Sequence, residues 1–415
     1  MFAAIIHNSF AQFVFEPNYE ENKVPKFEVP NVLETFKGKE VKTIKAWEGE
    51  RRPELLDFFT QNVYGEIPEK LGITSFEIVE QSDDAIEGKA KRKQVKLTFE
   101  KNRKELSFNV LLYLPKKLEK APIFIGYNFY GNHTVTSDPQ IIISDAWARN
   151  NESYGISNNQ LDEQSRGAKA SAWAIEKMID AGFGLATIYY GEVDPDKNDM
   201  TDGIHALFYA EGQQAPADNE WRSIAAWSWG LSRALDYLEG DADIDASNTI
   251  VFGHSRLGKA ALWAGATDER FAAVISNNSG CGGAALSKRK FGETIWRINN
   301  NFPHWFCDNF KKYSNNEEQL PVDQHALLAL IAPRPLYVAS AEEDEWADPR
   351  GELLSLHYAT PVYQLYNKDG IKNIEMPRVN QPIQNTAAYH IRTGKHAVTD
   401  FDWEQYIKWA KEQLF

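Results

Sequence analysis

Hydrophobic and polar positions follow two patterns along this chain. Between residues 74 and 114, three segments alternate or cluster β-forming residues, which predicts antiparallel strands at the edge of a sheet. From residue 123 onward, short apolar runs alternate with longer segments whose apolar residues have helical spacing. Strands that alternate with helices predict βαβ units, and therefore a parallel sheet with helices on both faces.

The same patterns give each element a residue range. Strands are expected over residues 74–79, 94–100, 107–114, 123–127, 184–190, 249–252, 272–276, 336–341 and 387–391. Helices are expected over residues 52–64, 168–181, 221–238, 323–330 and 402–413, with one more that starts at Arg256. This order predicts an α/β fold in which antiparallel N-terminal strands precede a mostly parallel central sheet.

The chain divides into a lead-in and one large unit. Residues 1–50 are polar with scattered prolines and are expected to be extended, whereas residues 51–415 are expected to form a single domain. Right-handed crossovers place the carboxyl ends of parallel strands along one edge of the sheet, where ligands bind. Polar insertions follow strand ends or lie in crossovers, so we expect them to form walls of a cleft: 133–165, 192–219 and 287–320.

Composition and charge narrow the classes of function. The formal net charge of -14 argues against nucleic acid and anionic lipid surfaces as partners, because like charges repel. The sequence has no run of about 18 apolar residues, so we expect no membrane span. The short apolar stretch over residues 2–6 has no basic residue before it, and we interpret residues 1–12 as at most the remnant of a signal peptide.

The main chemical signal is a serine between a strand and a helix. The apolar strand over residues 249–252 runs into the pattern Gly-x-Ser-x-x-Gly, with the serine at position 255. In α/β-hydrolases the nucleophile lies on such a sharp turn, and amides of the following helix face the developing oxyanion. The usual second glycine position holds Leu257, and the glycine comes one residue later, at Gly258. We therefore predict Ser255 as the nucleophile of an α/β-hydrolase; the alternative is a serine that only caps the helix.

A serine nucleophile needs a base to take its proton, and in this fold the chain order is serine, acid, histidine. Five histidines follow Ser255, and the base should lie on a loop after the last strand. His396 lies in such a loop, just before the last helix, and is the predicted base. His390, at the end of the last strand, is the second candidate.

The acid of the triad should follow the strand over residues 336–341. Residues 342–348 contain five carboxylates, most of which should be solvated. One of them would orient the imidazole and stabilise its cation. Asp344 lies about as far past the strand as such acids usually do and is the predicted acid, with Glu345 and Glu343 as alternatives.

No metal or cofactor is expected. The histidines are scattered, no His-x-x-x-His or cysteine pair has ligand spacing, and no glycine-rich phosphate loop follows the first strand of a βαβ unit. The two cysteines, Cys281 and Cys307, are either buried thiols or a single disulfide that closes a loop beside the site. Acyl transfer to water needs neither a metal nor a cofactor.

Five stretches of the chain carry a resemblance to a known family. They are residues 253–260 (Gly-His-Ser-Arg-Leu-Gly-Lys-Ala), 278–284 (Asn-Ser-Gly-Cys-Gly-Gly-Ala), 301–306 (Asn-Phe-Pro-His-Trp-Phe), 332–335 (Ala-Pro-Arg-Pro) and 394–396 (Gly-Lys-His). These stretches resemble the bacterial glucuronoyl esterases of carbohydrate esterase family 15. The resemblance extends from about residue 123 to the C-terminus, and its first two motifs are fairly specific to that family.

The resemblance implies an activity and a site. The enzyme would cleave the ester between (4-O-methyl-)glucuronic acid of glucuronoxylan and a lignin alcohol, through an acyl-enzyme on Ser255. Arg256 would help to hold the oxyanion, Lys259 would bind sugar hydroxyls and Trp305 would contact the sugar ring. Many members have their acid at the position of Asn278, whose amide carries no charge. This departure directs the acid to the loop after residue 341.

Two other functions stay open. One is an acetyl-xylan or feruloyl-type esterase on the same fold, and the other is a catalytically weak carbohydrate-binding homologue. Polymeric plant-wall material cannot enter a cell, so we expect a secreted or periplasmic protein. We also expect a monomer.

Overall fold

The computed structural model describes residues 16–68 and 70–415, so the expected signal-peptide remnant over residues 1–12 lies outside the described part. Its centre is a nine-stranded sheet with the order β1-β2-β3-β5-β4-β6-β7-β8-β9. All the predicted strand segments occur in this sheet, and most are longer than expected. The strands are β1 (Ser75–Ala85), β2 (Ala90–Lys101), β3 (Lys104–Pro115), β4 (Ala121–Asn128), β5 (Gly184–Tyr189), β6 (Ile244–His254), β7 (Ala273–Asn277), β8 (Leu336–Ala341) and β9 (Ala387–Arg392).

The sheet has an antiparallel part and a parallel part. β1, β2 and β3 pair antiparallel, and β3 pairs antiparallel with β5. From β5 through β4 to β9, every neighbouring pair is parallel. The predicted mostly parallel sheet with antiparallel N-terminal strands is therefore confirmed. The carboxyl ends of β4 to β9 all meet at one edge, where the loops that carry chemistry should lie.

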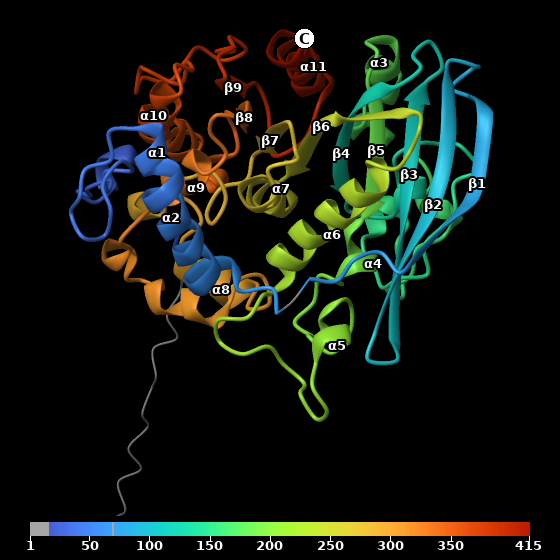
Figure 1. The fold of residues 1–415 in the computed structure, drawn as a ribbon, viewed down its shortest axis with the longest axis horizontal. Coiled ribbons are helices and arrows are strands. Elements are labelled where there is room, and N and C mark those ends of the chain that lie inside the picture. Colours follow the sequence, from blue (N-terminus) through green and yellow to red (C-terminus); the bar gives the residue numbers. More distant parts are fainter. Residues whose placement is uncertain (1–15, 69) are drawn as a thin grey trace, which may run out of the picture.

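Helices cover both faces of the sheet (Figure 1). The helices are α1 (Ile44–Ala46), α2 (Arg52–Phe59), α3 (Ile175–Asp180), α4 (Tyr190–Val193), α5 (His205–Phe208), α6 (Ser223–Leu238), α7 (Arg256–Thr267), α8 (Ile295–Asn301), α9 (Gln324–Ala329), α10 (Pro349–Leu365) and α11 (Asp400–Leu414). Apolar side chains of α3 and α11 share one hydrophobic core, and those of α6, α7, α9 and α10 share the other. Within β8, Tyr337 belongs to the first core and Val338 to the second, because successive strand side chains point to opposite faces.

Two helix predictions need correction. The helix expected over residues 168–181 is wrong over its first half, where only a short 3-10 turn precedes α3. Backbone amides of Gly167 and Lys169 donate instead to carbonyls of His133 and Thr134, so pairing with the preceding insertion replaces the helical hydrogen bonds. The second correction concerns α10, for which the sequence analysis gives no residue range. Its start is nevertheless local, because Asp348 caps it and proline follows at the first helical position.

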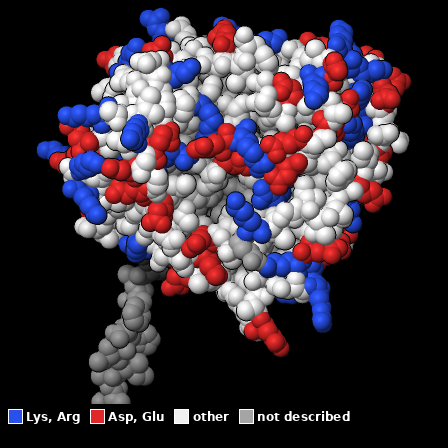
Figure 2. All heavy atoms as spheres, viewed as in Figure 1, with Lys and Arg blue, Asp and Glu red and all other residues white. Residues whose placement is uncertain are grey.

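The prediction of an extended lead-in is wrong at its end, because residues 44–46 form α1 and residues 47–51 continue it as a π-helix that leads into α2. Residues of the lead-in hydrogen-bond to the large domain, since Gly292 donates to the carbonyl of Asn18 and His325 contacts the carbonyl of Pro30. Within the described residues, no helix has the length and apolar character needed to cross a membrane. Basic and acidic side chains lie next to one another over much of the face in Figure 2, so the negative net charge forms no single patch there.

Candidate active site

The turn between β6 and α7 is a strained elbow at the carboxyl edge of the sheet. Ser255 has φ 57° and ψ −131°, a backbone conformation that residues other than glycine rarely adopt. A Cβ at residue 253 would lie 2.7 Å from the amide nitrogen of Gly258 and closer still to the carbonyl of Leu257. A Cβ at residue 258 would lie 3.0 Å from Cβ of Ser279. Both glycines are therefore required by close packing, which explains the shifted motif.

Replacing Gly253 by alanine is expected to destabilise the protein by about 3 kcal/mol or more, because the new methyl group meets backbone atoms that cannot move independently. Thermal unfolding measures this loss, and ester hydrolysis should fall with it. Gly240→Ala is the matched control, since its Cβ would meet its nearest atom at an ordinary 3.5 Å. Equal stability of the two variants would contradict the elbow geometry.

Three loops bring the predicted triad together. Nδ1 of His396 lies 2.6 Å from Oδ2 of Asp344, whose side chain is 5% exposed. Ser255 and His396 both line one cavity of about 300 Å³, together with Asp344. Burial alone would raise the pKa of Asp344, but its hydrogen bonds with His396 and Asn278 bring the pKa below its ordinary value. The carboxylate is thus charged and directed at the imidazole.

The alternative triad residues lie elsewhere. Glu343 and Glu345 are exposed, as expected for a mostly solvated acidic loop. His390 is fully buried, hydrogen-bonds to Tyr337 and Asp402, and is not among the residues that line the cavity.

Asn278 occupies the position where many relatives of the resembled family have their acid. Its Nδ2 donates to Oδ2 of Asp344 over 2.7 Å, the same oxygen that contacts His396. Asn278 has φ 50°, and its backbone amide donates to the carbonyl of Ala339 on the neighbouring strand. The side-chain amide of Asn278 therefore fixes the orientation of the Asp344 carboxylate.

Replacing Asn278 by aspartate is expected to place a second negative charge beside Asp344. The added carboxylate raises the pKa of Asp344, because a like charge replaces a hydrogen-bond donor, so the acid limb of the kcat/KM profile should move up by about one pH unit. The measurement is the pH dependence of ester hydrolysis. Asn278→Ala is the control, since it removes the hydrogen bond without adding charge and should lower kcat with no upward shift.

His254 packs directly against the predicted base. The centroids of the His254 and His396 rings are 4.5 Å apart, and Nδ1 of His254 lies 2.6 Å from Oδ1 of Asn277. Burial, with a smaller contribution from His396, lowers the pKa of His254 to about 3. Its ring is therefore neutral and leaves the positive charge of the catalytic cycle to His396.

A buried aspartate that sequence reasoning missed holds Arg256. Asp196 forms an ion pair with Arg256 and accepts hydrogen bonds from Nε2 of His304 and Nε1 of Trp305, each over 2.8 Å. Burial would raise the pKa of Asp196, but Arg256 and His304 hold it well below its ordinary value. The guanidinium also lies 4.9 Å from the centroid of the Trp305 ring. Asp196 lies in the insertion over residues 192–219, which local sequence does not link to the elbow.

A second pair of ionisable side chains, Lys259 and Glu293, also lines the cavity. Nζ of Lys259 donates to the carbonyl of Ser279 over 2.6 Å and lies 3.9 Å from Oε2 of Glu293. Burial lowers the pKa of Lys259 and raises that of Glu293. Sequence reasoning predicted Lys259 and missed Glu293, which comes from the third insertion. Both line the cavity, so it offers a hydrogen-bond donor and an acceptor side by side.

The cysteines are free in the structure. Cys281 and Cys307 are both buried thiols, which matches the first of the two interpretations of the sequence and contradicts the disulfide. Within residues 16–68 and 70–415, no group of three or more His, Cys, Asp or Glu side chains is arranged to hold a metal ion.

Comparisons with known proteins point in one direction. A family model described as "Glucuronyl esterase, fungi" matches residues 184–367. Carbohydrate esterase MZ0003, from an unknown prokaryotic organism, is 46% identical over 399 residues, which cover 96% of this chain and 92% of that protein.

Solved structures agree with the sequence comparisons. The structure of a promiscuous CE15 esterase from a marine bacterial metagenome has a TM-score of 0.90 and 46% identity, and covers 96% of this chain and 100% of that chain. The glucuronoyl esterase from Solibacter usitatus has a TM-score of 0.89 and 45% identity, over 95% of this chain and 100% of that chain. The similarity therefore extends over nearly the whole chain.

Proposed function

Because this chain belongs to the glucuronoyl esterases of carbohydrate esterase family 15, we propose that it hydrolyses esters of glucuronic acid with Ser255, His396 and Asp344 as its catalytic triad. The observation that carries the residue assignment is the short contact between His396 and the buried Asp344, in the same cavity as the serine elbow. The family resemblance and the predicted chain order of the triad agree with this assignment.

The geometry supports a two-step acyl transfer. His396 takes the proton of Ser255 as its oxygen attacks the ester carbonyl, and Asp344 stabilises the resulting imidazolium. The oxyanion develops beside the first amides of α7 and the guanidinium of Arg256. His396 then gives the proton to the departing alcohol, and water attacks the acyl-enzyme by the same route in reverse.

The charged groups around the cavity suit a uronic acid. Lys259 and Glu293 can hydrogen-bond neighbouring sugar hydroxyls, since one donates and the other accepts. Arg256, held in place by Asp196, suits an oxyanion flanked by sugar hydroxyls. Trp305 stacks on Phe302 with centroids 3.8 Å apart, and its remaining surface lines the cavity, where it would contact the sugar ring.

Substrate comparison tests this proposal. Benzyl glucuronate should be hydrolysed with a higher kcat/KM than an acetylated or a feruloylated sugar. A preference for either of the other two esters would favour the alternative carbohydrate esterase. Absence of turnover on all three, with no labelling of Ser255 by an organophosphonate probe, would favour a carbohydrate-binding homologue.

The natural substrate extends the proposal. We infer that the glucuronate is carried by glucuronoxylan and that the alcohol comes from lignin. Since these polymers cannot enter a cell, the protein would act outside the cytoplasm, either secreted or in the periplasm. We also propose that it acts as a monomer. Release of glucuronoxylan from a lignin–carbohydrate preparation measures this activity directly.

A further inference from the structure

A buried arginine holds the loop that carries His396. Arg392 is the last residue of β9 and is 2% exposed. Its guanidinium donates to three carbonyls of the following loop: Thr393 over 2.9 Å, Lys395 over 3.0 Å and Ala397 over 2.5 Å. Two of these carbonyls directly flank His396 in the chain. One side chain therefore binds three carbonyls of this loop.

A buried carboxylate holds the arginine in turn. Oδ2 of Asp402, in the first turn of α11, accepts from Nε of Arg392 over 2.8 Å. The same oxygen accepts from the amide and the hydroxyl of Thr399, which closes the capping box of α11. Burial would raise the pKa of Asp402, but hydrogen bonds from His390 and Thr399 and the charge of Arg392 bring it below its ordinary value.

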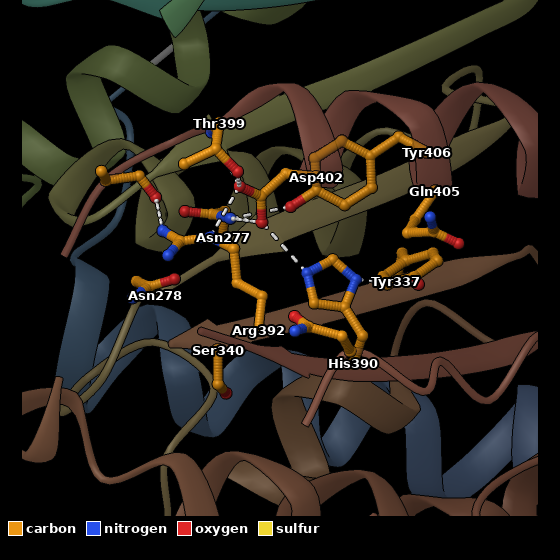
Figure 3. A network of polar contacts seen from close by, with 12 residues as sticks. Asn277, Asn278, Tyr337, Ser340, His390, Arg392, Thr399, Asp402, Gln405 and Tyr406 are labelled. Atoms are coloured by element: carbon orange, nitrogen blue, oxygen red, sulfur yellow. Dashed lines mark hydrogen bonds and ion pairs between the residues drawn. The ribbon is translucent and has the colours of Figure 1, made fainter. Parts of the chain in front are cut away.

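The second oxygen of Asp402 extends the network across the sheet (Figure 3). Oδ1 accepts from Nε2 of His390 over 3.0 Å and from Nδ2 of Asn277 over 3.1 Å. The hydroxyl of Tyr337 lies 3.0 Å from Nδ1 of His390, which fits a neutral imidazole that donates to Asp402. Asp402 thus joins β7, β9 and α11 at a single carboxylate.

Asn277 connects this carboxylate to the nucleophile. Its backbone carbonyl accepts from the amide of Ser255 over 2.9 Å, at the strained residue itself. Its side-chain oxygen contacts His254, whose ring packs on His396. The elbow and the base loop, more than a hundred residues apart in sequence, are therefore fixed to the same buried anion.

We propose that Arg392 and Asp402 are positioning residues for ester hydrolysis, which hold His396 at a fixed place relative to Ser255. The inference rests on the proposed function, in which His396 is the base. The His396 side chain is 40% exposed, so packing alone constrains it weakly. Burying an ion pair is costly and adds little stability by itself, which agrees with a role of this pair in geometry. A displacement of about 1 Å in such a site can reduce turnover about a hundredfold.

Arg392→Lys tests the proposal, because lysine keeps the charge but has three donors on a single nitrogen, too few for Asp402 and the three carbonyls together. We expect kcat on benzyl glucuronate to fall about 10- to 100-fold, with KM within about twofold of the original value. The downfield proton NMR resonance of Nδ1–H in His396 should broaden or disappear, since its contact with Asp344 loosens. A purely stabilising role of the arginine would change neither kcat nor this resonance.

Arg334→Lys is the matched control. Arg334 also donates to three carbonyls, those of Gly265, Asp268 and Phe271, but at the amino edge of the sheet, away from the cavity. It should lower the melting temperature by a similar amount and leave kcat within about twofold.

Asp402→Asn provides a second variant of nearly unchanged size, and we expect the same loss of kcat with little change in KM. Folded Arg392→Lys or Asp402→Asn protein with normal kcat and an unchanged resonance would overturn the proposal. So would failure of both variants to fold while Arg334→Lys folds, since the pair would then serve stability alone. His396→Ala distinguishes failure of this proposal from failure of the proposed function. Full activity of that variant would refute His396 as the base, and with it the proposed function.

Discussion

Replacing Ser255 by alanine is expected to abolish ester hydrolysis, with a loss of roughly 10⁵- to 10⁶-fold in kcat. The acyl-enzyme cannot form without the hydroxyl, and only positioning and oxyanion stabilisation would remain. Initial rates on benzyl glucuronate measure the loss, and the organophosphonate probe should no longer label the protein.

Ser247→Ala is the matched control for this variant. Ser247 lies on the same strand, β6, but it is exposed and its hydroxyl bonds only to Asp245 nearby. It should keep full activity. Retention of more than about 1% of activity by Ser255→Ala, after removal of contaminating esterase, would exclude this serine as the nucleophile.

Replacing Asp344 by asparagine is expected to lower kcat by about 10³- to 10⁴-fold, because an amide does not stabilise the imidazolium and favours the wrong tautomer of His396. KM should change little, since Asp344 contacts the base and not the ester.

Glu343→Gln is the control for charge in the same loop. Its side chain is exposed, so both kcat and the pH profile should stay as in the original protein. Near-normal turnover of Asp344→Asn would move the acid to Glu343 or Glu345. Asp344→Asn, Glu343→Gln and Glu345→Gln measured side by side would identify it.

Local patterns were sufficient for the sheet and for the elbow. The strand before Ser255, the glycines around it and the helix after it lie within about twenty residues, so neighbouring sequence predicts them. Helix α10 has a local start at Asp348 and Pro349 but contains Pro361, and its apolar spacing is less regular. The predicted helix over residues 168–174 does not form, because this segment pairs with the carbonyls of His133 and Thr134. Neighbouring sequence does not reveal this pairing, since both carbonyls lie in an earlier insertion.

Side chains that depend on long-range packing could not be predicted. Nothing near Asp196 indicates that it pairs with Arg256, sixty residues later in the chain. Glu293 reaches the cavity from an insertion whose path the pattern does not define. Within the acidic loop, sequence position favoured Asp344, but only the fold shows that this carboxylate is buried and that Glu343 and Glu345 are exposed.

The hydrogen bond between Asn278 and Asp344 has an evolutionary consequence. β7 and β8 are adjacent, so Asn278 after β7 and Asp344 after β8 meet beside His396. A lineage can therefore transfer the acid from one strand to its neighbour through an ancestor that carried both carboxylates, without an inactive step. Such a transfer would leave behind an uncharged residue, as at position 278 of this protein.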